Sequence, residues 1–198
     1  KLVEVIAEGY NLKPNQIDPE VPGVVVLVGP SGSGKNEIAR RMVKKSKNFE
    51  KLISYTTDAT VGLQGGEWYH YISVEAFREM VENGEMFEST MYAGHHYGSC
   101  KEDVEKILAN GKNVLTVMDI CGAMALKTLF PHVITIYVQR DKKELIKTIL
   151  ESGSPTEDKA NRLLFIEAES RNAQICDYTV RFDTPQQAVD QIRDCLQV

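Results

Sequence analysis

The chain has 198 residues, a formal net charge of −5 and 42% hydrophobic residues, a size and composition that suit one globular domain with a proper core. It has no basic tract, so nucleic acid and anionic membrane surfaces are not expected as partners. The four cysteines are widely spaced and no apolar stretch reaches the ~18 residues of a membrane span, so we expect a cytoplasmic protein with no membrane partner.

The first 22 residues are expected to form a lead-in segment. A short apolar patch at residues 2–6 is followed by a polar stretch that Pro14, Pro19 and Pro22 interrupt, and such punctuation indicates irregular chain. We expect this segment to pack on the domain or to link it to something upstream. The domain itself is expected to cover residues 23–198.

The strongest functional signal comes next. The apolar run Val24–Val28 precedes Gly-Pro-Ser-Gly-Ser-Gly-Lys, and an amphipathic helix pattern follows, which is typical of a loop that binds the phosphates of ATP or GTP. Glycines let successive N–H groups curl around a polyphosphate, and a helix that starts near Lys35 directs its positive end at the same anion. The residues predicted to bind the nucleotide are Gly29, Pro30, Ser31, Gly32, Ser33, Gly34, Lys35 and Asn36.

Asn36 departs from this pattern. The usual residue after the lysine is a serine or threonine whose hydroxyl helps to hold Mg²⁺. Asparagine still offers a carbonyl oxygen to a hard cation, so Asn36 is the candidate Mg²⁺ ligand, with weakened metal binding expected.

Beyond the loop, strand-like runs alternate with amphipathic helices. Buried strands are expected at Asn113–Met118 and Val133–Val138, a pattern that indicates a parallel α/β sheet. Ser73 is placed to cap a helix that Gly84 ends, and Gly111 is placed to end another.

Two segments differ from the buried strands. Residues 54–99 mix aromatic, polar and glycine residues and are expected to form a small inserted lobe. Residues around 151–160 separate two helices and are expected to serve as a short lid.

Four motifs in the lobe occur in a specific order: Tyr55-Thr-Thr57, Gly66–Ser73, Phe87-Glu88 and Gly94–Ser99. With the phosphate loop and Asp119, they make residues 24–183 resemble the guanylate kinase family. The resemblance implies an α/β P-loop NTPase fold, in which a parallel five-stranded sheet flanked by helices is built from residues 23–53 and 100–198. The inserted mixed α/β lobe would bind GMP or dGMP, and ATP with Mg²⁺ would supply the phosphoryl group, giving GDP and ADP.

The resemblance also implies roles for individual residues. Glu88 matches the carboxylate that accepts hydrogen bonds from the N1–H and 2-amino groups of guanine, two adjacent donors. Ser99 and Ser54 match residues of the same subsite. Tyr69 and Tyr97 match tyrosines whose hydroxyls reach the acceptor phosphate.

Three residues match catalytic positions. Lys35 would contact the donor phosphates, and Arg162 would contact the transferred group. Asp119 follows a buried strand at the carboxyl edge of the sheet and would lie near the metal or the acceptor.

Several family positions have changed. Asp58 and Val61 replace two arginines that would clamp the acceptor phosphate, and Val117 replaces the first acid of an Asp-x-Asp pair. At ~4 Å and an effective dielectric near 20, a unit charge pair is worth about 4 kcal/mol, so an aspartate turns attraction into comparable repulsion. Thr148 and Ser152 replace lid arginines, one of which can be worth ~10³ in rate.

Three hypotheses follow. The first is a guanylate kinase with reduced activity, in which nearby cations replace the lost ones; the candidates are Arg140, Lys147, Arg162 and Arg171. The second is a catalytically impaired nucleotide-binding or interaction module of the same fold. The third is a kinase with a different acceptor, such as a phosphorylated ribose. Glu88 and Ser99 favour guanine, whereas Asp58 opposes an ordinary phosphate clamp, and the oligomeric state is left open.

Overall fold

The computed structural model describes residues 21–60, 68–92 and 94–198, so most of the predicted lead-in segment and Val61 lie outside the described residues. A five-stranded sheet runs in the order β2-β7-β1-β8-β9, and every neighbouring pair is parallel, which confirms the predicted core. Its strands are β1 (Val24–Val28), β2 (Phe49–Lys51), β7 (Asn113–Val117), β8 (Val133–Gln139) and β9 (Tyr178–Arg181).

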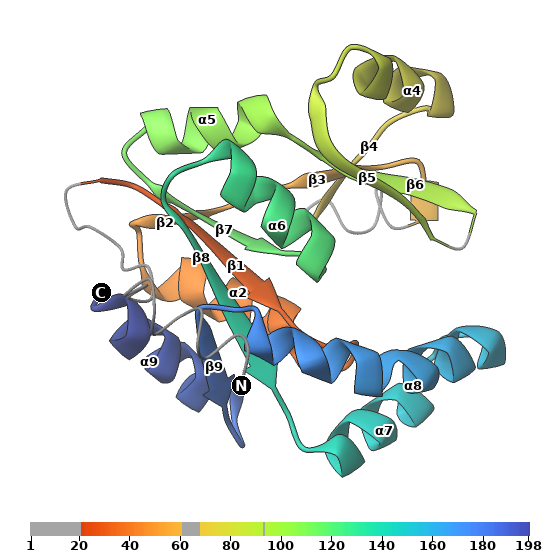
Figure 1. Ribbon diagram of the computed structural model, residues 1–198. Coiled ribbons are helices and arrows are strands. Elements are labelled where there is room, and N and C mark those ends of the chain that lie inside the picture. Colours follow the sequence, from red (N-terminus) through yellow and green to blue (C-terminus); the bar gives the residue numbers. More distant parts are fainter. Residues whose placement is uncertain (1–20, 61–67, 93) are drawn as a thin grey trace.

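Helices cover both faces of this sheet (Figure 1). Side chains of a strand alternate between faces, and in β1 Val25 and Leu27 pack in the cluster formed with α2 (Lys35–Lys45) and α9 (Pro185–Leu196). Val24, Val26 and Val28 pack in the other cluster, with α5 (Lys101–Ala109) and α6 (Ile120–Leu129). Because β1 is buried on both faces, its sequence is a continuous apolar run.

A second, mixed sheet has the order β4-β3-β6-β5. It consists of β3 (Ser54–Thr56), β4 (Tyr69–Tyr71), β5 (Met86–Tyr92) and β6 (His95–Cys100), with helix α4 (Val74–Glu82) beside it. As predicted, Ser73 caps α4, since its hydroxyl accepts the Ala76 N–H at 3.1 Å. Gly84, just after the helix, has a φ of 70°. These elements form the small lobe, whose boundaries with the core remain a prediction.

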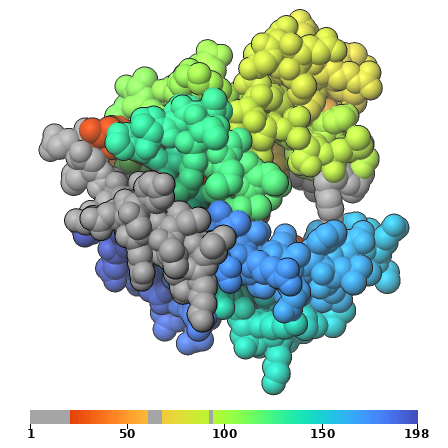
Figure 2. All heavy atoms as spheres, in the orientation of Figure 1, coloured from red at the N-terminus to blue at the C-terminus, as the bar shows by residue number. Residues whose placement is uncertain are grey.

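Helices α7 (Lys142–Glu151) and α8 (Thr156–Ser170) pack through a small apolar cluster of their own. Only residues 152–155 connect them, so the irregular part of the predicted lid is shorter than the stretch 151–160. A short 3-10 helix, η1 (Arg171–Gln174), leads back to the sheet. Figure 2 shows a cleft between the lobe and this pair of helices.

No helix within the described ranges is long and apolar enough to cross a membrane.

Asp177, just before β9, connects this segment with α6 and β8 through its carboxylate. Its Oδ2 accepts hydrogen bonds from Lys127 Nζ on α6 at 2.7 Å, and from Thr135 N–H and Oγ1 on β8 at 2.7 and 2.8 Å. The Asp177 side chain is only 14% exposed. Losing this carboxylate would leave the two donors of the buried Thr135 and the partly buried Lys127 ammonium without their acceptor.

We predict that Asp177→Ala lowers the free energy of unfolding by about 2–4 kcal/mol, because partly buried partners lose their acceptor. The control is Asp190→Ala, which removes a carboxylate that also pairs with a lysine, Lys45, at 2.9 Å but in solvent. Little change is expected there. Urea unfolding followed by circular dichroism measures both, and equal effects of the two substitutions would contradict the proposed role of Asp177.

Candidate functional site

The phosphate loop, residues 29–35, depends on glycine for its shape. Gly29, Gly32 and Gly34 have φ values of 149°, 81° and 88°, which favour glycine. A Cβ at Gly29 would lie 2.7 Å from the carbonyl oxygen of Val138, so space is restricted there as well. Helix α2 begins at Lys35, directly after the loop, and its positive end therefore faces the loop.

The Lys35 ammonium lies inside this loop. Nζ donates hydrogen bonds to the carbonyl oxygens of Gly29 at 2.6 Å and Pro30 at 2.8 Å, and a longer one to Ser33 Oγ at 3.3 Å. Burial lowers the pKa of Lys35 to about 8, although the negative charge of Glu169 on α8 acts in the opposite direction. The charge of Lys35 thus depends on pH in the range where other lysines stay protonated.

A cavity of about 490 Å³, here called the loop pocket, opens in front of the loop. The exposed Asn36 lines it, where its carbonyl oxygen is accessible to a hydrated cation. Val117 also lines it but offers no oxygen from its side chain. The remaining lining residues are Ser31, Gly32, Gly34, Lys35, Glu37, Arg40, Lys51, Leu52, Ser54, Trp68, Tyr69 and Thr116.

A second cavity of about 350 Å³, here called the lobe pocket, lies between the small lobe and the end of β7. All the predicted substrate-binding residues except Ser99 line it, namely Ser54, Tyr69, Glu88, Tyr97 and Asp119. Ser54, Tyr69 and Val117 line both pockets, so the two cavities adjoin. Residues far apart in the sequence therefore form one continuous site with the phosphate loop.

Ser99 lies behind the lobe pocket and orients Glu88. Its buried hydroxyl donates to Glu88 Oε1 at 3.0 Å, and its oxygen lies 2.9 Å from Ser54 Oγ. Since Ser99 has one hydroxyl proton, Ser54 is the donor in the second bond. Burial raises the pKa of Glu88 and the negative charge of Asp119 adds to this, whereas the Ser99 hydrogen bond lowers it.

Gly122 on α6 provides the space for this carboxylate. A Cβ at position 122 would overlap Glu88 Oε2. Asp119 Oδ1 accepts the Gly122 N–H at 2.9 Å and so caps α6 while lining the lobe pocket. Sequence reasoning found Asp119 but missed Gly122, because a glycine within a helix carries no signal of what approaches it from another element.

The two tyrosines predicted to reach the acceptor phosphate lie together. The rings of Tyr69 and Tyr97 meet edge to face, with centroids 5.6 Å apart. The Tyr97 hydroxyl donates to Asp58 Oδ2 at 3.3 Å, and the backbone N–H of Thr60 donates to Asp58 Oδ1 at 2.9 Å. A carboxylate therefore lies beside a hydroxyl that the resemblance assigns to the phosphate.

The segment between β8 and α7, and helix α8, bring further residues to the loop. Arg140 Nη1 donates to the carbonyl oxygen of Gly32 at 3.3 Å. Arg162 lines a separate cavity of about 530 Å³ with Ser31 and Glu169, but it lines neither the loop pocket nor the lobe pocket. The predicted catalytic arginine is therefore next to the phosphate loop, but away from the space that adjoins Glu88.

Sequence reasoning also missed a group of cations around Trp68 in the loop pocket. Lys51 Nζ lies 3.0 Å from the centroid of the Trp68 ring, and Arg40 Cζ lies 5.6 Å from it. Lys51 and Arg40, on β2 and α2, lie outside the motifs described above. Trp68 belongs to the Gly66–Ser73 motif and precedes β4, but nothing in that motif indicates that cations approach the ring.

The comparisons with known proteins agree with this geometry. The family model described as guanylate kinase matches residues 22–198. A guanylate kinase from Lactobacillus johnsonii is 34% identical over 178 residues, which cover 88% of this chain and 87% of that protein. One from Dechloromonas aromatica is 32% identical over 171 residues, or 85% of each chain.

A solved structure shares the fold. It is the crystal structure of guanylate kinase from Anaplasma phagocytophilum, with a TM-score of 0.69 and 24% identity over 90% of this chain and 86% of that one. On the family match and the two curated relatives, this chain belongs to the guanylate kinase family.

Proposed function

We propose that this chain is a guanylate kinase that transfers a phosphoryl group from ATP to GMP or dGMP. The observation that carries the proposal is the hydrogen-bonded series Ser54–Ser99–Glu88 in a pocket that adjoins the phosphate loop. Guanine presents N1–H and 2-amino donors side by side, and an oriented carboxylate accepts both. Adenine lacks this pair of donors, so the site would discriminate between the two purines.

The donor half would hold the phosphates of ATP. The loop supplies backbone N–H groups and the end of α2, and Lys35 supplies a positive charge. Mg²⁺ takes most of its ligands from water and substrate phosphates, so one protein oxygen suffices. The side-chain oxygen of Asn36 would be that ligand, and the ion would neutralise charge on the transferred group. Among the described residues, no three His, Cys, Asp or Glu side chains gather at one point to hold a metal.

Reduced turnover forms part of the proposal. Phosphoryl transfer depends on positioning and charge neutralisation. Thr148, which stands where the family resemblance implies a lid arginine, lies beside Gly32 of the phosphate loop and carries no charge. Arg140 touches the loop and would replace part of the missing charge. Arg162 would act at the transferred group only after α8 moves toward the lobe.

The cytoplasm is the compartment we propose. Cys100, Cys121, Cys176 and Cys195 are all unpaired thiols, as cysteines are in a reducing environment.

An ADP-release assay coupled to pyruvate kinase and lactate dehydrogenase tests the proposed reaction. We expect ATP-dependent turnover with GMP and dGMP that clearly exceeds turnover with AMP, CMP or UMP, because these lack the two donors that Glu88 accepts. If the chain binds ATP but turnover stays at background with every acceptor, the proposed kinase activity is refuted. That result would favour the catalytically impaired module.

Glu88→Gln tests guanine recognition. Replacing one carboxylate oxygen by an NH₂ group puts a donor opposite a donor, so we expect KM for GMP to rise about 10- to 100-fold. KM for ATP should stay within about twofold. The matched control is Glu82→Gln, an exposed position on α4 in the same lobe. A KM for GMP that responds equally to both substitutions would contradict the role of Glu88.

The pKa of Lys35, about 8, predicts a pH dependence of ATP binding. The ammonium is almost fully charged at about pH 7 and loses its proton as the pH rises through about 8. The binding of ATP must then restore the proton, so above pH 8 the affinity should fall by up to about tenfold per pH unit.

Titration calorimetry from pH 7 to 9.5 in buffers of different ionisation enthalpy measures both the affinity and the proton uptake. In Lys35→Arg the side chain stays charged throughout, and its ATP affinity should be independent of pH over this range. A wild-type affinity as flat as that of the arginine variant would show that Lys35 does not titrate there.

A further inference from the structure

One face of α8 lies beside the phosphate loop. The cavity of about 530 Å³ that Arg162 lines, here called the α8 cavity, is also lined by Glu169 of the same helix and by Ser31 of the loop. The other lining residues are Asp158, Asn161 and Phe165, which follow one another at helical spacing and so share this face. Ser31 lines the loop pocket as well, so the two cavities meet at the phosphate loop.

Glu169 brings a negative charge to the loop. The residue is partly buried. Burial raises the pKa of Glu169, whereas the Lys35 ammonium and the backbone N–H of Ser31 lower it. A lysine and the N–H groups of such a loop are what binds a phosphate. The carboxylate of Glu169 therefore lies beside groups that the donor phosphates would use.

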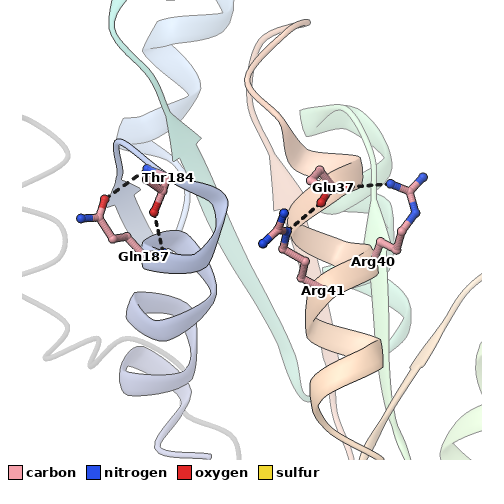
Figure 3. Close-up of polar contacts among 5 residues, drawn as sticks. All are labelled: Glu37, Arg40, Arg41, Thr184 and Gln187. Atoms are coloured by element: carbon pink, nitrogen blue, oxygen red, sulfur yellow. Dashed lines mark hydrogen bonds and ion pairs between the residues drawn. The ribbon is translucent and has the colours of Figure 1, made fainter.

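Glu37, a second carboxylate near the loop, makes contacts of another kind. It lies in the first turn of α2 and accepts hydrogen bonds from Arg40 Nη1 at 2.6 Å and from Arg41 Nε at 2.7 Å (Figure 3). Both partners belong to its own helix, so these ion pairs connect no other element to the loop. Glu169 belongs to α8, and its contacts join that helix to the loop.

A bound triphosphate would compete with Glu169. Its oxygens would accept from the N–H groups of the loop and pair with Lys35. A carboxylate beside the same groups repels this negative charge, and the repulsion is strong where burial limits screening by solvent. The binding of ATP therefore favours an arrangement in which Glu169 lies farther from the loop.

A displacement of Glu169 also displaces Arg162. The two residues are seven positions apart, which corresponds to two turns of α8, and they line the same cavity. Arg162 lines neither the loop pocket nor the lobe pocket. Movement of α8 across the cleft that Figure 2 shows would bring the arginine nearer to the acceptor.

We propose that Glu169 is a positioning residue that holds α8 on the phosphate loop, and that the donor phosphates displace it, so that ATP binding moves Arg162 toward the lobe. This inference rests on the proposed function and adds to it the step that couples ATP binding to the position of the catalytic arginine. Glu169 acts through Lys35, Ser31 and its own helix.

Calorimetry with Glu169→Gln tests the competition. Glutamine keeps the size of the side chain and an oxygen that accepts an N–H, but it carries no charge. We expect ATP to bind about 5- to 10-fold more tightly to this variant, because the repulsion of the phosphates is lost. A role in packing alone predicts equal or weaker binding.

The matched control is Glu157→Gln. It removes an exposed carboxylate in the first turn of α8, outside the α8 cavity and the loop pocket. Its ATP affinity should stay within about twofold of wild type, since an exposed charge contributes little.

Double electron–electron resonance tests the movement of α8. Spin labels at Ala160 on α8 and Arg78 on α4, both exposed, report the distance from this helix to the lobe. Cys121, Cys176 and Cys195 are replaced by serine so that only the two chosen positions are labelled. We expect ATP to shorten the distance in the otherwise unchanged chain, and Glu169→Gln to populate the shorter distance without ATP.

An ATP affinity of Glu169→Gln equal to or weaker than that of wild type, with a wild-type circular dichroism spectrum, would overturn the inference. So would a distance from α8 to the lobe that ATP leaves unchanged. Turnover with GMP is measured separately on the wild type. Absent turnover with tighter ATP binding by the variant and a shortened distance would refute the proposed catalysis and support the role of Glu169, whereas normal turnover with unchanged ATP affinity would refute that role alone.

Discussion

The sharp turn of the chain from β1 into α2 is the constraint on which the site depends. β1 is buried on both faces and leads directly to Gly29, where a side chain would meet the carbonyl oxygen of Val138 on the neighbouring strand. The loop then returns through glycines with positive φ to start α2 at Lys35. Because the turn is fixed by the middle of the sheet, the lysine, the helix end and the loop pocket are positioned by the most rigid part of the core.

Residues of the small lobe complete the site beside this turn. Its residues Ser54 and Tyr69 form the wall common to both pockets, and Glu88 is held in place by Ser99 on one side and by the space left at Gly122 on the other. Glu88 and Asp119 line the lobe pocket, and Lys35 lies in the phosphate loop, so the two halves of the site present groups of opposite charge.

Local patterns in the sequence predicted much of this arrangement. The apolar run at Val24–Val28 favours burial on two faces, and the glycine spacing favours a curled loop. Ser73 accepts one N–H of the first turn of α4. Each of these signals acts over a few residues. The order of the motifs in the lobe also predicted that Glu88, Tyr69 and Tyr97 belong to the site, and all three line the lobe pocket.

Contacts between distant segments escaped prediction. Arg40 and Lys51 come from α2 and β2, and Trp68 from the segment before β4, and the sequence around each residue does not indicate that the three meet. Ser99 matched a motif, but its depth behind Glu88 follows from the pairing of β5 with β6. Such relations depend on how sheets and helices pack, which no local pattern contains.

A crystal structure with GMP and a non-hydrolysable ATP analogue is the most direct test, because it shows which residues each nucleotide contacts. We predict that the guanine edge contacts Glu88 in the lobe pocket and that the ATP phosphates lie in the phosphate loop beside Lys35. A guanine bound away from Glu88, or ATP phosphates bound away from the loop, would contradict this assignment.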